Sequence, residues 1–318
     1  MKIAEIQGLA GRIRAEIARA VVGQDATVDL LLTALLAGGH MLLEGPPGTA
    51  KTFLVQCFAR AVEAKFGRIQ FTPDLMPGDI IGSNVFDFRS GSFALTPGPV
   101  FCDVLLADEI NRTPPKTQAA LLEAMQERRV TIDGTSYDLG ARFMVVATQN
   151  PLEHQGTYPL PEAQIDRFLF KQVLDYPSEE EERDVVRRHG ARAGSLDPGV
   201  FGIAPVVSAA DLDAAVATVS CVRLGEPIVD YVVRTVRATR GSPDLESGAS
   251  PRSAAMLAVA SRARAALDGR DYVIPDDVRA LALPVLRHRV VLSPAAEIDG
   301  RRVNEVVAYL LSRVEAPR

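Results

Sequence analysis

The stretch Gly45-Pro46-Pro47-Gly48-Thr49-Ala50-Lys51-Thr52 decides the fold, and it directly follows the apolar run Met41–Leu43. A strand, a glycine-rich loop, a lysine, a threonine and a helix in this order are typical of a phosphate-binding loop. The glycines let backbone N–H groups surround the phosphates, the lysine reaches the β- and γ-oxygens, and the threonine hydroxyl can ligate Mg²⁺. A helix beginning near Lys51 points the positive end of its dipole at the same anion. The sequence therefore predicts that ATP binds here with Mg²⁺.

One position departs from the usual pattern of this loop. Ala50 stands where the pattern G-x-x-x-x-G-K-[ST] has its last glycine. Alanine costs little at this position if its φ angle is negative. On that condition we interpret Ala50 as a variant of the loop that leaves the site intact.

Length and composition indicate a sizeable globular protein. The 318 residues suggest two domains, and 47% hydrophobic with 24% charged residues supply a buried core. No apolar run reaches the roughly 18 residues that span a bilayer, and the first residues lack the apolar core of a signal peptide. We therefore expect no transmembrane segment and a cytoplasmic location. The cysteines Cys57, Cys102 and Cys221 form no C-x-x-C pair, and we expect all three to be reduced core residues.

Five short apolar runs alternate with helical patterns in the first part of the chain. Continuous hydrophobicity marks strands that are buried on both faces, so we expect an α/β fold with a parallel sheet covered by helices. The predicted strands are His40–Leu43, Arg68–Phe71, Val100–Ala107, Phe143–Thr148 and Phe168–Leu174.

A segment rich in glycine, alanine and proline, Gly190–Pro205, marks a predicted domain boundary. Beyond it only helix signals remain, and the expected domains are a nucleotide-binding core at 1–190 and an all-helical domain at 191–318. The predicted helix starts are Ser208 with Asp211, Pro227, Ser250-Pro251, Pro275 and Val303.

Two acids end the strand that carries Val104–Ala107, namely Asp108 and Glu109. Ligands of a parallel sheet bind at the carboxyl ends of its strands, so these acids should face the phosphate-binding loop. Asp108 and Thr52 are the expected Mg²⁺ ligands, and Glu109 is the expected catalytic acid that orients the attacking water. Acids at a strand end are also common turn-formers, and it is the loop that favours the catalytic interpretation.

The strand Phe143–Thr148 ends in Gln149-Asn150-Pro151. An amide beside the acidic pair can hydrogen-bond the γ-phosphate or the water, so Asn150 is a further candidate catalytic residue. An isolated asparagine before proline would be only a turn signal.

These motifs together resemble an AAA+ ATPase, and the finer phrases resemble the MoxR family. The phrases are the loop with alanine at 50, Leu106-Ala107-Asp108-Glu109-Ile110-Asn111-Arg112, Ala147-Thr148-Gln149-Asn150-Pro151, Gly156-Thr157-Tyr158-Pro159-Leu160-Pro161-Glu162-Ala163-Gln164 and Asp166-Arg167-Phe168. The resemblance extends over nearly the whole chain. It implies a five-stranded AAA+ core followed by a helical lid domain.

The resemblance also implies roles for two arginines. Arg167 matches the arginine finger, which acts on the site of a neighbouring subunit. Without the resemblance, a surface ion pair would be the better interpretation of Arg167. Arg252 matches the sensor-2 arginine, and we expect it to act in cis on the nucleotide of its own subunit. Its place in the first turn of a helix opposes the helix dipole and indicates a nearby anion.

Two segments resemble insertions of the same clade. Gly82–Leu95 matches an insert in the second helix, and Arg129–Leu139, with Asp133-Gly134 as its turn, matches a hairpin before the asparagine strand. In the family these segments project toward a ring pore or a partner. They can equally be plain structural hairpins.

The expected function is ATP hydrolysis by a ring, with a hexamer as the expected assembly. The resemblance implies chaperone-like remodelling, assembly or metal-cofactor maturation of a client, with a von Willebrand factor A-type protein as the expected partner. A nucleic-acid motor of the same clade is one alternative, although the formal net charge of −5 weighs against a broad nucleic-acid surface. A nucleotide-controlled scaffold with low turnover is the other.

Overall fold

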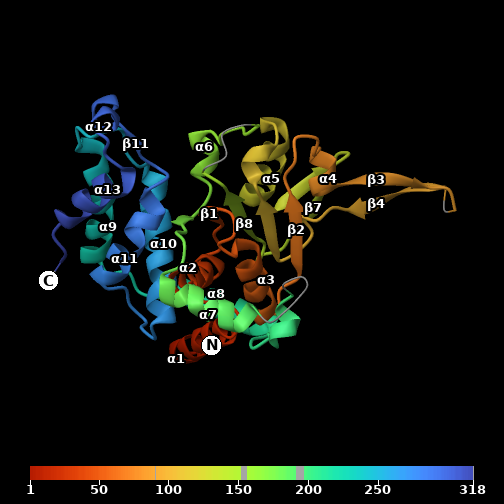
Figure 1. The fold of residues 1–318 in the computed structure, drawn as a ribbon, viewed down its shortest axis with the longest axis horizontal. Coiled ribbons are helices and arrows are strands. Elements are labelled where there is room, and N and C mark those ends of the chain that lie inside the picture. Colours follow the sequence, from red (N-terminus) through yellow and green to blue (C-terminus); the bar gives the residue numbers. More distant parts are fainter. Residues whose placement is uncertain (90, 152–155, 191–196, 318) are drawn as a thin grey trace.

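A five-stranded sheet forms the centre of the computed structural model, which describes residues 1–89, 91–151, 156–190 and 197–317 (Figure 1). The strands run in the order β2-β5-β8-β1-β9 and every pairing is parallel. Their bounds are β1 Met41–Glu44, β2 Phe66–Gln70, β5 Val104–Asp108, β8 Met144–Gln149 and β9 Phe170–Val173. All five predicted strands are confirmed, with ends that shift by a few residues.

Both faces of this sheet are buried, as the continuous apolar runs predict. Successive side chains of a strand point to opposite faces, so Leu105 and Leu106 belong to two different buried clusters. On one face lie α2 (Asp25–Leu36) and α3 (Lys51–Ala61), and on the other lie α4 (Pro77–Ile81) and α5 (Pro115–Glu127). The sheet is therefore the middle layer of an α/β sandwich.

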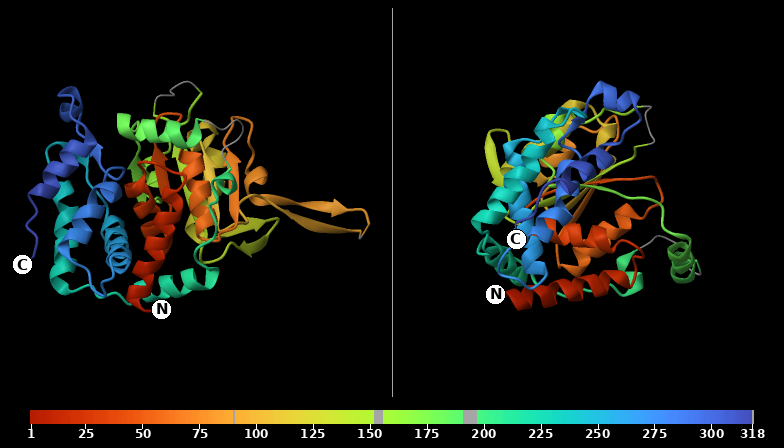
Figure 2. Two further views of the ribbon diagram at one scale, coloured as in Figure 1. Left: turned by 60° about the horizontal axis from the view of Figure 1, so that its bottom comes forward. Right: turned by 90° about the vertical axis from the view of Figure 1, so that its left-hand side faces the viewer.

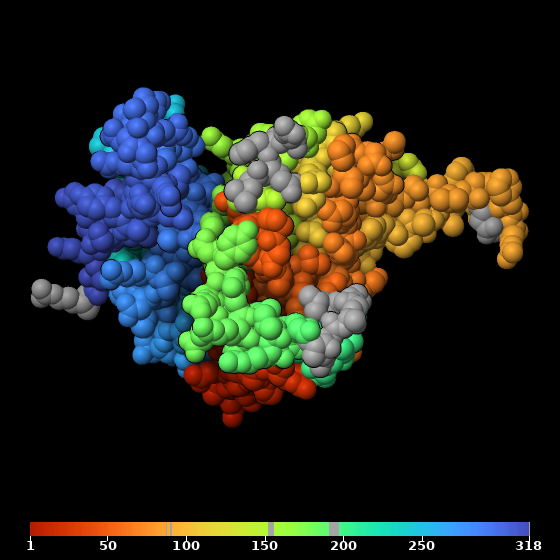
Figure 3. Space-filling view, in the orientation of Figure 1, coloured from red at the N-terminus to blue at the C-terminus, as the bar shows by residue number. Residues whose placement is uncertain are grey.

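Two antiparallel hairpins extend from this core. The first pairs β3 (Gly82–Asp87) with β4 (Ser92–Pro97) and projects from the side opposite the lid as a narrow arm (Figures 1 and 3). The second pairs β6 (Arg129–Ile132) with β7 (Thr135–Asp138). Asp133 and Gly134 at its turn have φ angles of 48° and 81°, the left-handed pair that a two-residue hairpin turn requires. Both predicted insertions therefore form hairpins.

The lid is helical, and its predicted helix starts are confirmed. Ser208 accepts a hydrogen bond from the N–H of Asp211 and caps the first lid helix. The lid helices are α8 Ala209–Ser220, α9 Glu226–Ala238, α10 Pro251–Leu267, α11 Pro275–Leu286, α12 Pro294–Ile298 and α13 Val303–Ser312. The lid also contains an antiparallel pair, β10 (Leu245–Ser247) with β11 (Val291–Leu292). These strands are too short to give a hydrophobic period, which is why the sequence predicted only helices.

Two further helices, α1 (Ile3–Ala18) and α7 (Glu179–His189), lie outside the sheet and pack against its neighbours. Helix α1 packs against both α3 and α10 (Figure 2). Helix α7 lies across the front of the molecule, and Ser178 caps it (Figure 3).

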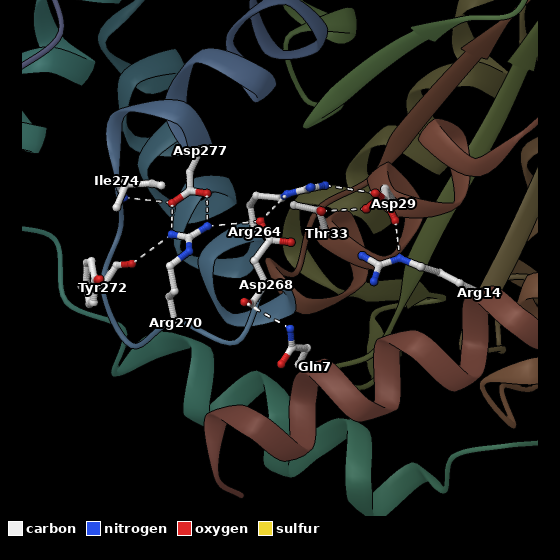
Figure 4. Close-up of polar contacts among 10 residues, drawn as sticks. All are labelled: Gln7, Arg14, Asp29, Thr33, Arg264, Asp268, Arg270, Tyr272, Ile274 and Asp277. Atoms are coloured by element: carbon white, nitrogen blue, oxygen red, sulfur yellow. Dashed lines mark hydrogen bonds and ion pairs between the residues drawn. The ribbon is translucent and has the colours of Figure 1, made fainter.

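Ion pairs join the lid to the N-terminal helices (Figure 4). Asp29 of α2 binds Arg14 of α1 at 2.6 Å and Arg264 of α10 at 3.1 Å. One hydrophobic cluster also continues from α1 through the lid. The division of the chain into domains at 1–190 and 191–318 stays a prediction, and these contacts show that the two parts share a core.

The cysteines do not all behave as expected. Cys57 and Cys102 are buried, and burial raises the pKa of each thiol to about 12. Cys221 is exposed, so its predicted place in the core is wrong. Cys221 is the C-cap of α8, where the chain turns at the surface.

Among the helices described, none combines the length and apolar character needed to cross a membrane.

Candidate active site

The phosphate-binding loop joins β1 to α3, and its backbone explains its glycines. A Cβ atom on Gly45 would lie 2.7 Å from the carbonyl oxygen of Leu174, so only glycine fits there. Gly48 has a φ angle of 84°, which glycine adopts without strain. Ala50 has a φ angle of 56°, so the condition under which alanine would cost little here is not met. A left-handed alanine costs about 1–2 kcal/mol, and such strain is often concentrated at functional sites.

Lys51 is the first residue of α3, and its ammonium group rests on the loop. Its Nζ donates to the carbonyl oxygens of Gly45 at 2.9 Å and Pro46 at 2.7 Å, and to Thr49 Oγ1 at 3.3 Å. Burial lowers the pKa of Lys51, against the attraction of Asp108 and Glu109. The cation is thus held among oxygen acceptors at the mouth of the loop.

Asp108 lies at the point where α3, β2 and β8 meet the end of β5. Its Oδ1 accepts from Thr148 Oγ1 at 2.6 Å. Its Oδ2 accepts from Thr52 Oγ1 at 3.3 Å and from Arg68 Nη2 at 2.8 Å. Thr52 and Asp108 therefore present two neighbouring oxygen donors from separate elements, which is the ligand type that Mg²⁺ prefers. The side chains present fit a magnesium ion.

Glu109 follows β5 directly and has a φ angle of 57°. Its N–H donates to Thr148 Oγ1 at 2.9 Å, which fixes the backbone against β8. Its carboxylate Oε2 accepts from Gln70 Nε2 at 2.8 Å and pairs with Arg112 Nε at 3.1 Å. The left-handed turn thus directs Glu109 away from the path of the strand, and two donors hold its carboxylate.

A cavity of about 600 Å³, here called the phosphate cavity, collects these side chains. Residues 47–52 of the loop, Asp108, Glu109 and Asn150 all line it. Gly45 and Pro46 lie behind the lysine and contribute carbonyl oxygens to it. The structure therefore brings the predicted residues of three separate strands to one place, although their catalytic roles stay predictions.

Six residues that line the phosphate cavity were not predicted as site residues: Phe53, Gln56, Arg68, Gln70, Thr148 and Gln149. Arg68 and Gln70 alternate with Ile69 on β2, and Gln70 is the register partner of Asp108. A polar alternation in a strand next to the acidic strand was the available signal. The sequence gave no signal for Thr148, because a threonine within an apolar strand is common.

A second cavity of about 390 Å³, here called the apolar cavity, adjoins the loop. It shares Gly48–Ala50 and Phe53 with the phosphate cavity. Its other lining residues come from α7 and from the segments before α2 and α7: Ala20, Val21, Val22, Gln24, Tyr176, Pro177, Glu182, Val185, Val186 and His189. His189 Nε2 bonds to the carbonyl oxygen of Ala20 at 3.0 Å and fastens α7 to this wall. An apolar pocket beside a phosphate site suits an aromatic base.

The two candidate arginines lie elsewhere. Arg167 and Arg252 line a third cavity of about 350 Å³, here called the arginine cavity, together with Arg128. No described residue lines both this cavity and the phosphate cavity. Arg252 therefore does not line the cavity of the phosphate-binding loop in its own subunit, and its expected action in cis stays a prediction. Its helix α10 begins next to the turn that precedes β9, and the anion near Arg252 is Asp166, with Nη1 and Oδ2 3.8 Å apart.

His40 forms part of the wall of the arginine cavity and is buried. Its Nε2 bonds to the carbonyl oxygen of Met125 at 3.0 Å, and its Nδ1 accepts from the N–H of Val145 at 3.0 Å. Burial lowers the pKa of His40 to about 4. The ring is therefore neutral at physiological pH, and the positive charge of the cavity comes from its arginines.

Comparisons with known proteins agree over the whole chain. Residues 40–170 match the ATPase family associated with various cellular activities (AAA), and residues 237–309 match the AAA lid domain. The chain is 46% identical to Chaperone MoxR1 of Mycobacterium tuberculosis, over 95% of this chain and 81% of that protein. It is 35% identical to Protein MoxR of Methylorubrum extorquens, over 97% and 95%. A crystal structure of a candidate ATPase from Cytophaga hutchinsonii is similar with a TM-score of 0.91 at 38% identity, covering 99% of this chain and 97% of that one.

Proposed function

We propose that the ATPase site of this chain, which belongs to the MoxR family of AAA+ ATPases, is completed by a second copy of the chain. The chain itself is an AAA+ ATPase with a helical lid. One observation carries the proposal: Lys51 and Glu109 line one cavity, whereas Arg167 and Arg252 line another. Phosphoryl transfer needs a cation on the developing charge of the γ-phosphate. A neighbouring subunit can supply the arginines that the same subunit keeps apart.

In this proposal each half of the site has a distinct task. The loop N–H groups and Lys51 bind the phosphates, and the apolar cavity takes the adenine. Thr52 and Asp108 would hold Mg²⁺, which when bound compensates charge on the phosphate oxygens. Glu109, whose carboxylate is held by Gln70 and Arg112, orients and polarises the attacking water.

The arginine cavity supplies the other half. Arg167 and Arg252 of the neighbour stabilise the charge that develops on the γ-phosphate, while Asn150 hydrogen-bonds the γ-phosphate or the water. A cavity that presents three arginines suits a polyanion, and a guanidinium binds phosphate oxygens through several N–H groups at once.

A composite site of this kind favours a closed ring, and a hexamer is our proposed assembly. Because ATP would contact two subunits, it is a ligand of the interface and should promote assembly. Sedimentation velocity of Glu109→Gln with and without ATP and Mg²⁺ tests this. A single monomer peak in both samples, up to concentrations of roughly tens of micromolar expected for a weak interface, would contradict the ring.

We further propose that hydrolysis drives chaperone-like remodelling of a client, of the von Willebrand factor A type or one that acquires a metal cofactor. The name of the similar protein Chaperone MoxR1 supports the chaperone role. The β3–β4 arm offers a contact surface, since Phe88 is 90% and Phe93 72% exposed. A pull-down with Glu109→Gln in ATP, repeated with Phe88→Ser in the same background, tests the arm. Equal capture of the client by both forms would assign the contact to another surface.

The decisive experiment for the composite site mixes two inactive variants. Lys51→Ala loses the phosphate half and keeps the arginine half, and Arg167→Ala does the reverse. Mixed rings contain interfaces with one intact half from each, so we expect ATPase activity to return on mixing. Mixtures that co-assemble and stay as inactive as the two parents would overturn the proposal.

A further inference from the structure

Arg289 follows α11 in the lid, and its side chain is 1% exposed. Its guanidinium has five N–H groups, and it donates to five oxygen atoms and, from Nη2, to Met256 Sδ at 2.8 Å. Nε donates to Asp166 Oδ1 at 2.7 Å, and Nη2 donates to the carbonyl oxygens of Asp166, at 2.9 Å, and Phe168. Nη1 donates to the carbonyl oxygen of Leu169 at 3.2 Å and to that of Val285.

Four of the five oxygen acceptors belong to the turn that carries Arg167. They are the carboxylate and the carbonyl of Asp166, on one side of Arg167, and the carbonyls of Phe168 and Leu169 on the other. His288 adds a bond from Nε2 to the carbonyl oxygen of Phe168 at 2.9 Å. The backbone on both sides of Arg167 is therefore fixed by two consecutive lid residues.

We propose that Arg289 is a positioning residue that sets the direction of Arg167 into the arginine cavity. The proposal rests on the function proposed above, in which Arg167 acts on the nucleotide of a neighbouring subunit. Arg289 does not line the described wall of that cavity, so it acts through the turn and not by touching phosphate. The lid thereby controls the position of Arg167, the proposed arginine finger.

Two features argue for positioning over simple attachment of the lid. A buried cation carries a large desolvation penalty, and an apolar contact would hold the lid at lower cost. The acceptors, moreover, are concentrated on one turn of four residues, where a planar fork fixes several carbonyl directions together. Asp166 Oδ2 also lies 3.8 Å from Arg252 Nη1, so the carboxylate next to Arg167 in the chain also pairs with Arg252. A displacement of about 1 Å at a reacting group can reduce turnover roughly 100-fold.

The test uses the full-length chain with Arg289→Gln. We expect its ATPase rate to fall roughly 10- to 100-fold, as for a displaced catalytic group. Its affinity for a fluorescent ATP analogue should stay as in the parent protein, because the phosphate and apolar cavities are intact. Mixing Arg289→Gln with Lys51→Ala should restore activity, whereas mixing it with Arg167→Ala should not, because both variants then lack the arginine half.

A matched control separates positioning from loss of lid stability. Arg270 of the lid forms a two-point ion pair with the buried Asp277, with distances of 2.7 and 2.6 Å, and its hydrogen bonds all go to lid residues (Figure 4). Arg270→Gln should lower the melting temperature and keep the ATPase rate per folded ring. If Arg289→Gln does not fold, Arg289→Lys serves instead, since lysine keeps the charge but has three donors. We expect it to show the same complementation pattern with a smaller loss.

Failure of the positioning role of Arg289 can be distinguished from failure of the composite ATPase site. If Arg167→Ala and Lys51→Ala do not complement, the proposed function fails. If they complement while Arg289→Gln does not rescue Lys51→Ala in co-assembled rings, the positioning role is overturned. It is also overturned if Arg289→Gln weakens nucleotide binding as much as it lowers the ATPase rate, because that result indicates general damage.

Discussion

The phosphate cavity and the arginine cavity are built in different ways. Side chains of the phosphate cavity sit at the ends of β1, β5 and β8 and are held by neighbours in the same sheet, as Asp108 is held by Thr148. Arg167 and Arg252 of the arginine cavity sit on a short turn and on a lid helix, and contacts between that turn and the lid hold them. A parallel sheet dictates that strand ends meet, whereas only packing decides where a lid lies.

This difference implies a division of labour between the two cavities. In the proposed composite site the sheet would bind the phosphates, and the lid would set the position of the arginines. Among its described lining residues, the arginine cavity has three arginines and no carboxylate. This lining fits the proposed action of the cavity on the nucleotide of a neighbouring subunit. The following predictions test this contrast.

The largest effect should come from Glu109 in the phosphate cavity. Glu109→Gln removes the charge that polarises water while keeping the shape, so we expect turnover to fall roughly 10²–10⁴-fold with unchanged ATP affinity. Lys51→Ala should instead lose ATP binding itself. Single-turnover rates and binding isotherms of both variants measure this. Hydrolysis by Glu109→Gln at the parent rate would assign the catalytic acid elsewhere.

Arg252→Ala tests whether the arginine cavity acts as one unit. We expect a loss of roughly 10²–10³-fold in turnover, as for removal of one preorganised charge-stabilising donor. Its position next to Arg167 predicts that Arg252→Ala complements Lys51→Ala and fails to complement Arg167→Ala. Rescue of Arg252→Ala by Arg167→Ala in mixed rings would mean that Arg252 acts on its own subunit. The proposal that the arginine cavity acts as one unit on a neighbouring subunit would then be wrong.

His40 connects the two regions, because it lines the arginine cavity and bonds to β8. Its pKa is lowered to about 4 in the folded state, so the unfolded chain binds its proton first as the pH falls below 6.5. Stability from the neutral ring is complete above pH 6.5 and is lost toward pH 4. We expect about 2 kcal/mol of this loss by pH 5.

Urea unfolding of the parent and of His40→Gln at pH 7.5 and pH 5 isolates this contribution. His288 also has a pKa lowered by desolvation, and it is present in both proteins, so the difference between them belongs to His40. Equal pH slopes for the two proteins would mean that His40 keeps an ordinary pKa.

The smallest effect concerns Ala50. Its φ angle of 56° is left-handed, so Ala50→Gly should relieve strain and raise the free energy of unfolding by about 0.5–1 kcal/mol. Denaturant melts measure the change. Gly48→Ala, at a φ angle of 84°, is the matched reverse change and should destabilise the protein. Destabilisation by Ala50→Gly would show that the loop is not strained at this position.

Prediction from the sequence succeeded where chemistry and local pattern coincide. The five strands were found because burial on both faces leaves uninterrupted apolar runs, and Lys51, Asp108 and Asn150 were found because they follow such runs. Ser208 and Asp211 predicted a helix start through a capping pair that is local in the chain. The φ angle of Ala50 could not be read in this way, since the residue type favours the opposite sign from the one that the turn into α3 imposes.

The sequence by itself therefore determined the sheet, the phosphate-binding loop and the acids at the strand ends, because each depends on residues that are close along the chain or on a fixed period. Only the tertiary structure decided that Arg252 lies beside Arg167 and away from Lys51. It also decided that Arg289, more than a hundred residues later, binds the turn around Arg167. Such placements follow from how the helices of the lid pack on the core, and packing has no period that a single sequence displays.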